Sequence, residues 1–328
     1  SRDVIGLIVQ CRAAESYNLR QSRNRRIMGR KQSLNEAVRG VGVTPATPFG
    51  DDLTEVDFAG LKGNLRFLVE SGVEMFYPAG NTGEVMSLSA EEWTGVVEVA
   101  VDVAGREACV VPGISHELPV AVELARRASG LGADGLLLMP RTQPYISSKG
   151  LIHYWRAIRD VTDLPVVLYL RGLPDLDDLV EELGDDDVVA CKYADKDISR
   201  FASAVSADDS GIAWTCGIAE RYAPYFWRAG SVGFTSGLAN FAPALSLRLQ
   251  QLLEDGQSEP AEELSLRCLP FEEIRARNGD SFNVAAVKAA MDRIGLAGGR
   301  VRPPLVDLDE AAAHDLTRAL PSLETVEV

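Results

Sequence analysis

The sequence is poor in the side chains that bind metal ions or build disulfide frameworks. Its 328 residues include three histidines and five cysteines, with no CxxC pair and no HxxxH or HxH spacing. This scarcity argues against a metal-centred reaction and predicts reduced, buried thiols in a cytoplasmic protein. The residues concerned are Cys11, Cys109, Cys191, Cys216, Cys268, His116, His153 and His314.

Positive charge is also in short supply. The chain has 33 Lys and Arg against 48 Asp and Glu, which gives a formal net charge of −15. Such a charge opposes nucleic acid or an anionic membrane as a partner, because both would be repelled at long range. Long apolar runs are missing too: the longest, at residues 135–140 and 164–170, are far shorter than the roughly 20 residues of a membrane-spanning helix. With 46% hydrophobic and 25% charged residues, the composition predicts a soluble globular protein.

The first 33 residues differ from the rest. Arginines crowd this stretch and only Asp3 and Glu15 oppose them, while Met28 stands just before the regularly patterned chain. An Arg-rich, acid-poor start is compatible with a transit peptide. The simpler interpretation is an N-terminal extension, residues 1–33, outside the folded core.

From residue 41 onward, short β-branched and aliphatic runs alternate with amphipathic stretches of helical length. Strands that alternate with helices pair in parallel through right-handed crossovers, and eight such units close most naturally into a barrel. We therefore predict an α/β fold, a (β/α)8 TIM barrel over residues 34–240 with a C-terminal helical region over 241–328. The expected strands are 41–47, 73–78, 108–112, 135–140, 165–170, 188–192, 212–216 and 231–235; helices are expected at 57–71, 90–104, 118–131, 150–161 and 219–229.

In a barrel of this kind, function gathers where the strands end. Lys192 ends an apolar strand. Side chains alternate between the two faces of a strand, so Lys192 lies on the same face as Val188 and Ala190. Inside the barrel, desolvation would lower the pKa of this amine and make it a nucleophile able to form a Schiff base with a ketone. A solvated surface lysine is the alternative. Residues 80–84 (Gly-Asn-Thr-Gly-Glu) predict a tight turn whose N–H groups and Thr82 hydroxyl suit a carboxylate.

Several motifs in order resemble one known family. They are residues 43–49 (VTPATPF), 80–84, Lys192, 233–243 (GFTSGLANFAP) and 301–305 (VRPPL). From about residue 34 to 308 the chain is similar to the dihydrodipicolinate synthase / N-acetylneuraminate lyase family of class I aldolases. The resemblance implies Lys192 as the Schiff-base lysine, Thr82 and its neighbouring N–H groups as ligands of a 2-keto-acid carboxylate, no metal or other cofactor, and a homo-oligomer, commonly a tetramer.

Within that family, residues 76–88 look closest to the 5-dehydro-4-deoxyglucarate dehydratase branch. Asn81 stands where the synthase branch usually has a threonine of the proton relay, and an amide cannot shuttle a proton in that way. Arg171 resembles an arginine of the dehydratase branch that holds a second, distal carboxylate, for which a bidentate guanidinium is well suited.

The relay tyrosine that the family usually has after the fourth strand is missing. A gapless count puts Thr142 at that position, and Tyr145 follows three residues later. Tyr145 could move into the same place through a shift of the loop, or another group could carry the proton.

These residues predict a lyase that binds a small 2-keto acid as a lysine Schiff base and acts as a dehydratase or aldolase of a keto-deoxy sugar acid. The alternatives are the synthase reaction of pyruvate with aspartate semialdehyde and a non-catalytic keto-acid binder. The expected catalytic residues are Lys192, Tyr145 and Thr142; the expected substrate-binding residues are Thr82, Asn81, Gly83, Thr47, Arg171, Gly217 and Ser236.

Overall fold

A computed structural model describes residues 34–141, 145–172 and 188–324. In these residues nine parallel strand segments form one sheet, in the order β3-β2-β1-β9-β8-β7-β6-β5-β4. The predicted N-terminal extension, Thr142 and the final residues lie outside the described part of the chain. The strands are β1 (Val41–Val43), β2 (Met75–Phe76), β3 (Cys109–Val110), β4 (Gly113–Ile114), β5 (Leu136–Leu138), β6 (Val166–Leu170), β7 (Val188–Tyr193), β8 (Ala213–Cys216) and β9 (Gly233–Ser236).

The sheet closes because β3 and β4 are two halves of one strand. The N–H of Val111 donates to the Phe76 carbonyl on one side, and the Pro112 carbonyl accepts from the N–H of Leu137 on the other. Pro112 has no N–H of its own, so the ladder is interrupted there without loss of the strand direction. With β3 and β4 counted as one strand, eight strands form the barrel, and the predicted TIM barrel is confirmed.

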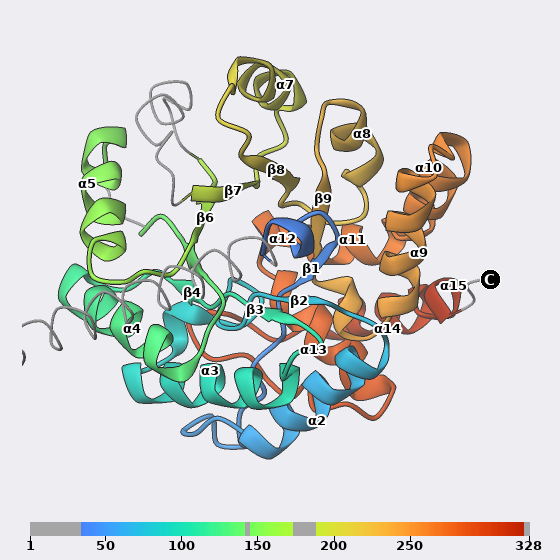
Figure 1. The fold of residues 1–328 in the computed structure, drawn as a ribbon. Helices are drawn as coiled ribbons and strands as arrows, with labels where there is room; N and C mark the ends of the chain where they lie inside the picture. The colour runs from blue at the N-terminus through green and yellow to red at the C-terminus, as the bar shows by residue number, and fades with distance from the viewer. Residues whose placement is uncertain (1–33, 142–144, 173–187, 325–328) are drawn as a thin grey trace, which may run out of the picture.

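Helices surround the sheet (Figure 1). Two predicted helices have the expected bounds, α3 and α4, and Ser89 and Glu92 form a capping box at the start of α3. One helix starts later than predicted: the chain takes a left-handed turn at Ala219 (φ 68°), and α8 begins only at Ala223. The helices that follow strands are α2 (Phe58–Glu70), α3 (Ala90–Ala104), α4 (Leu118–Leu131), α5 (Ser148–Arg159), α7 (Ile198–Ala207) and α8 (Ala223–Arg228).

The chain beyond β9 is helical, as the sequence predicts, and α9 packs against β1 and β9. Short 3₁₀ turns, η1 (Val85–Ser87) and η2 (Leu238–Asn240), follow β2 and β9. None of the helices in the described residues is long and apolar enough to cross a membrane. The C-terminal helices are α9 (Pro243–Glu254), α10 (Ser258–Arg267), α11 (Leu269–Arg275), α12 (Arg277–Asp280), α13 (Asn283–Arg293), α14 (Glu310–Ala319) and α15 (Pro321–Glu324).

Candidate active site

Lys192 lies near the end of β7, inside the barrel. The residue is buried, with 6% of its surface exposed. Its Nζ lies 5.2 Å from the ring centre of Tyr77 and 5.0 Å from that of Tyr169. Burial lowers the pKa of the amine from 10.5 to about 7, and the nearby Arg171 guanidinium acts in the same direction. A substantial fraction of Lys192 is therefore uncharged and nucleophilic at neutral pH.

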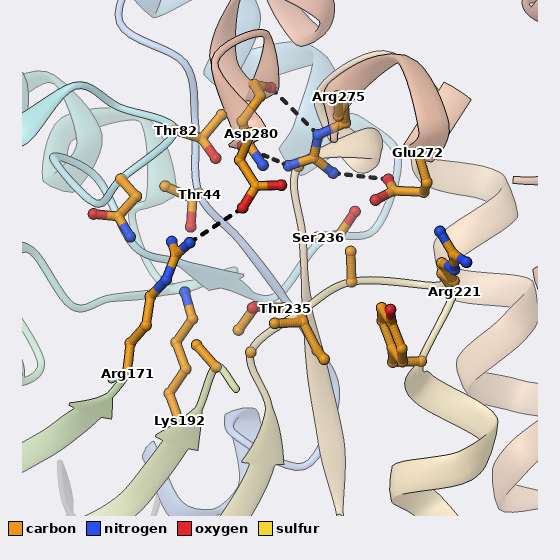
Figure 2. Close-up of a pocket in the computed structure, with 18 of the residues that line it drawn as sticks. Thr44, Thr82, Arg171, Lys192, Arg221, Thr235, Ser236, Glu272, Arg275 and Asp280 are labelled. Atoms are coloured by element: carbon orange, nitrogen blue, oxygen red, sulfur yellow. Dashed lines mark hydrogen bonds and ion pairs between the residues drawn. The ribbon is translucent and has the colours of Figure 1, made fainter. Parts of the chain in front are cut away.

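Lys192 lines a cavity of about 150 Å³ at the C-terminal ends of the strands. Figure 2 shows Lys192 and Arg171 extending from β7 and β6 toward the same space. Six of the predicted site residues line this cavity: Lys192, Asn81, Thr82, Arg171, Gly217 and Ser236. The structure therefore brings together side chains from distant parts of the sequence, as expected for strand ends of a barrel.

Residues 80–84 form the turn that the sequence predicts. Gly80 is required there, because a Cβ would lie 2.7 Å from Cγ2 of Thr44 on the neighbouring strand end. The backbone N–H groups of Asn81 and Thr82 have no acceptor within the described part of the chain. Thr44 and Thr82 are buried, with 4% and 7% of their surface exposed. Their hydroxyls and the two N–H groups together offer donors for an anionic group.

The tyrosines beside the lysine are Tyr77 and Tyr169, not Tyr145. Tyr145 is 97% exposed and does not line the cavity, which corrects the expectation that it moves inward. Tyr169 is buried on β6, and its hydroxyl accepts a hydrogen bond of 2.9 Å from Nδ2 of Asn81. Burial raises the pKa of this phenol, so it keeps its proton at neutral pH. Thr142, the other expected relay residue, lies outside the described residues.

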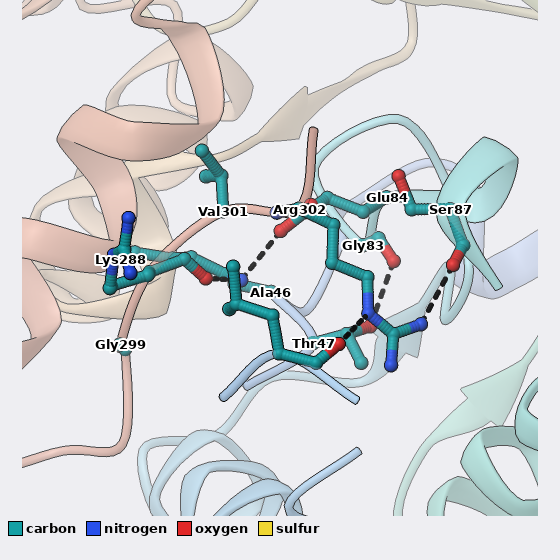
Figure 3. Close-up of polar contacts among 12 residues, drawn as sticks. Ala46, Thr47, Gly83, Glu84, Ser87, Lys288, Gly299, Val301 and Arg302 are labelled. Carbon is teal, nitrogen blue, oxygen red and sulfur yellow. Dashed lines mark hydrogen bonds and ion pairs between the residues drawn. The ribbon is translucent and has the colours of Figure 1, made fainter. Parts of the chain in front are cut away.

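Two expected substrate ligands have structural roles instead. Thr47 is fully buried, and its hydroxyl donates 2.8 Å to the carbonyl of Gly83. Neither residue lines the cavity. A Cβ on Gly83 would lie 3.0 Å from the Pro45 carbonyl, so the glycine permits close packing against the segment after β1. The hydrogen bond between Thr47 and Gly83 therefore fixes the turn to the segment after β1 (Figure 3).

The same turn is anchored to the C-terminal region by buried charges. Glu84 forms an ion pair with Lys288, with Oε1 and Nζ 2.5 Å apart and both side chains fully buried. The N–H of Arg302 donates 3.0 Å to the other Glu84 oxygen, and its guanidinium forms two hydrogen bonds with Glu92, of 2.8 and 2.6 Å. Figure 3 shows Glu84 between Lys288 and the Val301–Arg302 backbone. The 301–305 motif thus serves to fix the turn that lines the cavity.

The C-terminal helices also contribute to the cavity, which sequence reasoning missed. Asp280 at the end of α12 pairs with Arg171 across 3.4 Å, and Arg275 of α11 binds Glu272 and Asn283. Further lining residues are Thr44, Tyr169 and Thr235. Thr44 and Tyr169 stand at predicted strand ends, so their position was a usable signal. No sequence pattern indicated which residues of the helical region would reach the strand ends.

Within residues 34–141, 145–172 and 188–324, no group of three or more His, Cys, Asp or Glu side chains is arranged to hold a metal ion.

Comparison with known proteins supports the family expectation. A profile of the dihydrodipicolinate synthetase family matches residues 37–323. A 4-hydroxy-tetrahydrodipicolinate synthase from Methanothrix thermoacetophila is 32% identical over 294 residues, which cover 86% of this chain and 97% of the relative. A probable 5-dehydro-4-deoxyglucarate dehydratase from Bacillus licheniformis is 29% identical, with 88% and 94% covered.

A solved structure agrees with these relatives. The dihydrodipicolinate synthase of Oceanobacillus iheyensis is 34% identical and superposes with a TM-score of 0.85, covering 89% of this chain and 98% of that one. The names of the relatives divide between synthase and dehydratase at similar identity. The chain belongs to the dihydrodipicolinate synthetase family, whose members are lyases of the class I aldolase type.

Proposed function

We propose that this protein is a Schiff-base lyase that removes water from a keto-deoxy sugar acid, with Lys192 as the nucleophile. The observation that carries the proposal is the position of Lys192: its amine is buried, has a pKa of about 7, and shares a cavity with Arg171. A buried amine of this kind condenses with a ketone, and a guanidinium near the cavity mouth suits a second carboxylate.

The reaction follows from the chemistry of the iminium ion. The Lys192 amine adds to the C2 ketone, and loss of water gives a protonated imine that withdraws electrons from C3. Carbons are numbered from the carboxylate next to the ketone, so the deoxy carbon of a 4-deoxy-5-keto hexarate is C3. A base removes a proton from C3, the C4–O bond breaks, and the hydroxide takes up a proton and leaves as water. Hydrolysis of the imine returns the free amine and releases the dehydrated keto acid.

The carboxylate next to the ketone would bind at residues 80–84. Thr44 and Thr82 provide hydroxyl donors, and the N–H groups of Asn81 and Thr82 are available for the same oxygens. This arrangement supports a substrate whose C1 carboxylate lies beside the carbon that Lys192 attacks. The substrate would then be fixed in the orientation that the addition step requires.

Arg171 would hold the far end of the substrate. Its ion pair with Asp280 is long, at 3.4 Å, and both side chains are about half exposed, at 52% and 43%. An exposed pair of this kind contributes little stability, so a substrate carboxylate can replace Asp280 at low cost. A second cavity of about 390 Å³ borders Asn81, Tyr169 and Arg171 from the other side, which leaves room for a chain longer than pyruvate.

Tyr169 is the proposed proton-transfer group in place of Tyr145. Its hydroxyl oxygen is oriented by Asn81, and its ring lies against Lys192. Because burial raises its pKa, the phenol is protonated at neutral pH. It can donate a hydrogen bond near the imine, or give up its proton and regain one in a later step. Asn81 then has an orienting role, which is consistent with an amide at a position where it cannot relay protons.

The competing function is the condensation of pyruvate with aspartate semialdehyde on the same lysine, which is favoured by the relatives named as synthases. A keto-acid binder without turnover is the third candidate, motivated by Thr142 at the position of the relay tyrosine and by Asn81 at that of the relay threonine. As the resemblance implies, we also propose a homo-oligomer, dimer or tetramer, in the cytoplasm.

A substrate comparison tests these functions. The protein is incubated with a 4-deoxy-5-keto hexarate, and separately with pyruvate and aspartate semialdehyde, and both products are quantified. We expect dehydration of the hexarate at the higher kcat/KM, lost in Lys192→Ala and retained in Lys149→Ala, a change at an exposed lysine of α5. A higher kcat/KM for the condensation would overturn the dehydratase assignment, and turnover of neither set would favour the binder.

A further inference from the structure

A carboxyl group is buried behind the cavity. Glu220 has no exposed surface, and it follows the loop that leaves β8. In that loop Gly217 passes close to β7, where a Cβ would lie 2.7 Å from the Tyr193 carbonyl. Ala219 takes a left-handed φ of 68°, a conformation that is strained for a residue with a Cβ. The strained turn directs Glu220 into the protein rather than toward solvent.

Two serine hydroxyls connect Glu220 to the cavity. The Ser246 hydroxyl donates 2.6 Å to Oε1 of Glu220, and its oxygen lies 3.3 Å from that of Ser236. Ser236 lines the cavity that contains Lys192 (Figure 2). Hydroxyl groups both donate and accept, so this row of oxygens can carry a proton in either direction.

The surroundings of Glu220 favour the neutral acid. Its Oε2 has no hydrogen-bond partner among the described residues. The charged group that acts on it is Glu272, whose own charge is paired with Arg275. The titratable groups Cys216 and Cys268, which Glu220 influences in turn, are buried thiols. Burial and the charge of Glu272 raise the pKa of Glu220. A buried carboxyl without a cation or a full set of donors keeps its proton.

We infer that Glu220 is the buried acid that supplies, through Ser246 and Ser236, the proton with which the substrate hydroxide leaves as water. This role rests on the proposed dehydration. Ser236 touches the substrate, whereas Glu220 acts through the serines and is a positioning residue and proton source. In the neutral acid the proton on Oε1 of Glu220 points to Ser246, which then donates to Ser236 in place of Glu220. When the C4–O bond breaks, Ser236 gives its proton to the leaving oxygen, Ser246 gives its proton to Ser236, and Glu220 gives its proton to Ser246. The proton taken from C3 passes to solvent, and after the product has left Glu220 regains a proton from solvent through Ser236 and Ser246, so the cycle neither gains nor loses a proton.

The test separates the steps before and after imine formation. In Glu220→Gln, which keeps the shape but has no acidic proton, three quantities are compared with wild type. They are borohydride trapping of Lys192 with pyruvate, exchange of the pyruvate methyl protons in D2O, and dehydration of the 4-deoxy-5-keto hexarate. We expect trapping and exchange within about 3-fold of wild type, and kcat for dehydration lower by about 100-fold, the scale of a lost general acid.

The pH profile and two further variants complete the test. Wild-type kcat should fall at alkaline pH as Glu220 loses its proton, and Glu220→Gln should lack that fall. Ser246→Ala, which interrupts the path without removing a carboxyl, should reduce dehydration in the same selective way and decides the question if Glu220→Gln does not fold. Glu254→Gln on the same helix, α9, serves as the control with wild-type rates.

Each other outcome overturns the inference. Dehydration within about 3-fold of wild type in both Glu220→Gln and Ser246→Ala would show that the path carries no essential proton. An equal loss of exchange and dehydration in both variants would show a structural role alone. Failure of wild type to dehydrate the hexarate, with trapping intact, would refute the proposed function and this role with it.

Discussion

Replacement of Lys192 by methionine should make the protein more stable while it abolishes the chemistry. A lysine in water has a pKa of 10.5, and burial lowers that of Lys192 to about 7. At about 1.36 kcal/mol for each pH unit, this difference corresponds to a folding penalty of about 5 kcal/mol at pH 7. The rings of Tyr77 and Tyr169, at 5.2 and 5.0 Å, favour the ammonium and offset part of it. We expect Lys192→Met to gain about 3 to 5 kcal/mol at pH 7.

The pH dependence gives this prediction its sign. Between pH 7 and 10.5 the unfolded chain holds a proton that the folded chain has released, so wild-type stability rises with pH in that window. The advantage of Lys192→Met should therefore shrink by about 1 to 3 kcal/mol from pH 7 to pH 9. Denaturant unfolding of both proteins at the two pH values measures this, with Lys149→Met as the control at an exposed site. A destabilised variant, or an advantage independent of pH, would refute the desolvation argument.

Three further predictions concern residues around the lysine. Arg171→Ala should raise KM for the hexarate by about 10-fold to 100-fold, the scale of a lost charged hydrogen bond, and leave borohydride trapping with pyruvate unchanged; equal effects on both would contradict the distal role. Tyr169→Phe should slow exchange of the pyruvate methyl protons by about 100-fold at unchanged thermal stability, and wild-type exchange would exclude it as the proton-transfer group. Lys288→Met should destabilise the protein by about 3 to 5 kcal/mol in denaturant unfolding, because it leaves Glu84 buried without its cation. The double variant with Glu84→Gln should recover part of that loss. A loss below about 1 kcal/mol in Lys288→Met would argue against the buried pair.

The fold could be predicted from local patterns because the barrel repeats one unit. The start of the helix at Ala90–Ala104 is indicated by the capping box of Ser89 and Glu92. The bounds of Leu118–Leu131 are indicated by Pro119 in its first turn and Gly132 at its end. The start of α8 could not be predicted in the same way. The left-handed conformation of Ala219 depends on the packing of the loop after β8, which the propensity of alanine does not reveal.

The site was predictable only as far as strand ends identify it. Lys192, Thr82 and Arg171 follow from strand position and residue chemistry. Tyr145, expected as one possible proton-transfer residue, is exposed and lies away from the cavity, because counting residues along a loop cannot say where the loop turns. Glu272 and Asp280 reach the cavity through the packing of α11 and α12 over the barrel, which is a tertiary arrangement without a local signal.

The central claim is that Lys192 forms a covalent imine with a 2-keto acid. The most direct measurement is borohydride reduction in the presence of pyruvate, and separately of a 4-deoxy-5-keto hexarate, followed by mass mapping of the peptides. We predict a reduced adduct on Lys192 with both compounds, more complete with the hexarate, and none in Lys192→Met. Folded protein that gives no adduct with either compound, or an adduct on another lysine, would contradict the account.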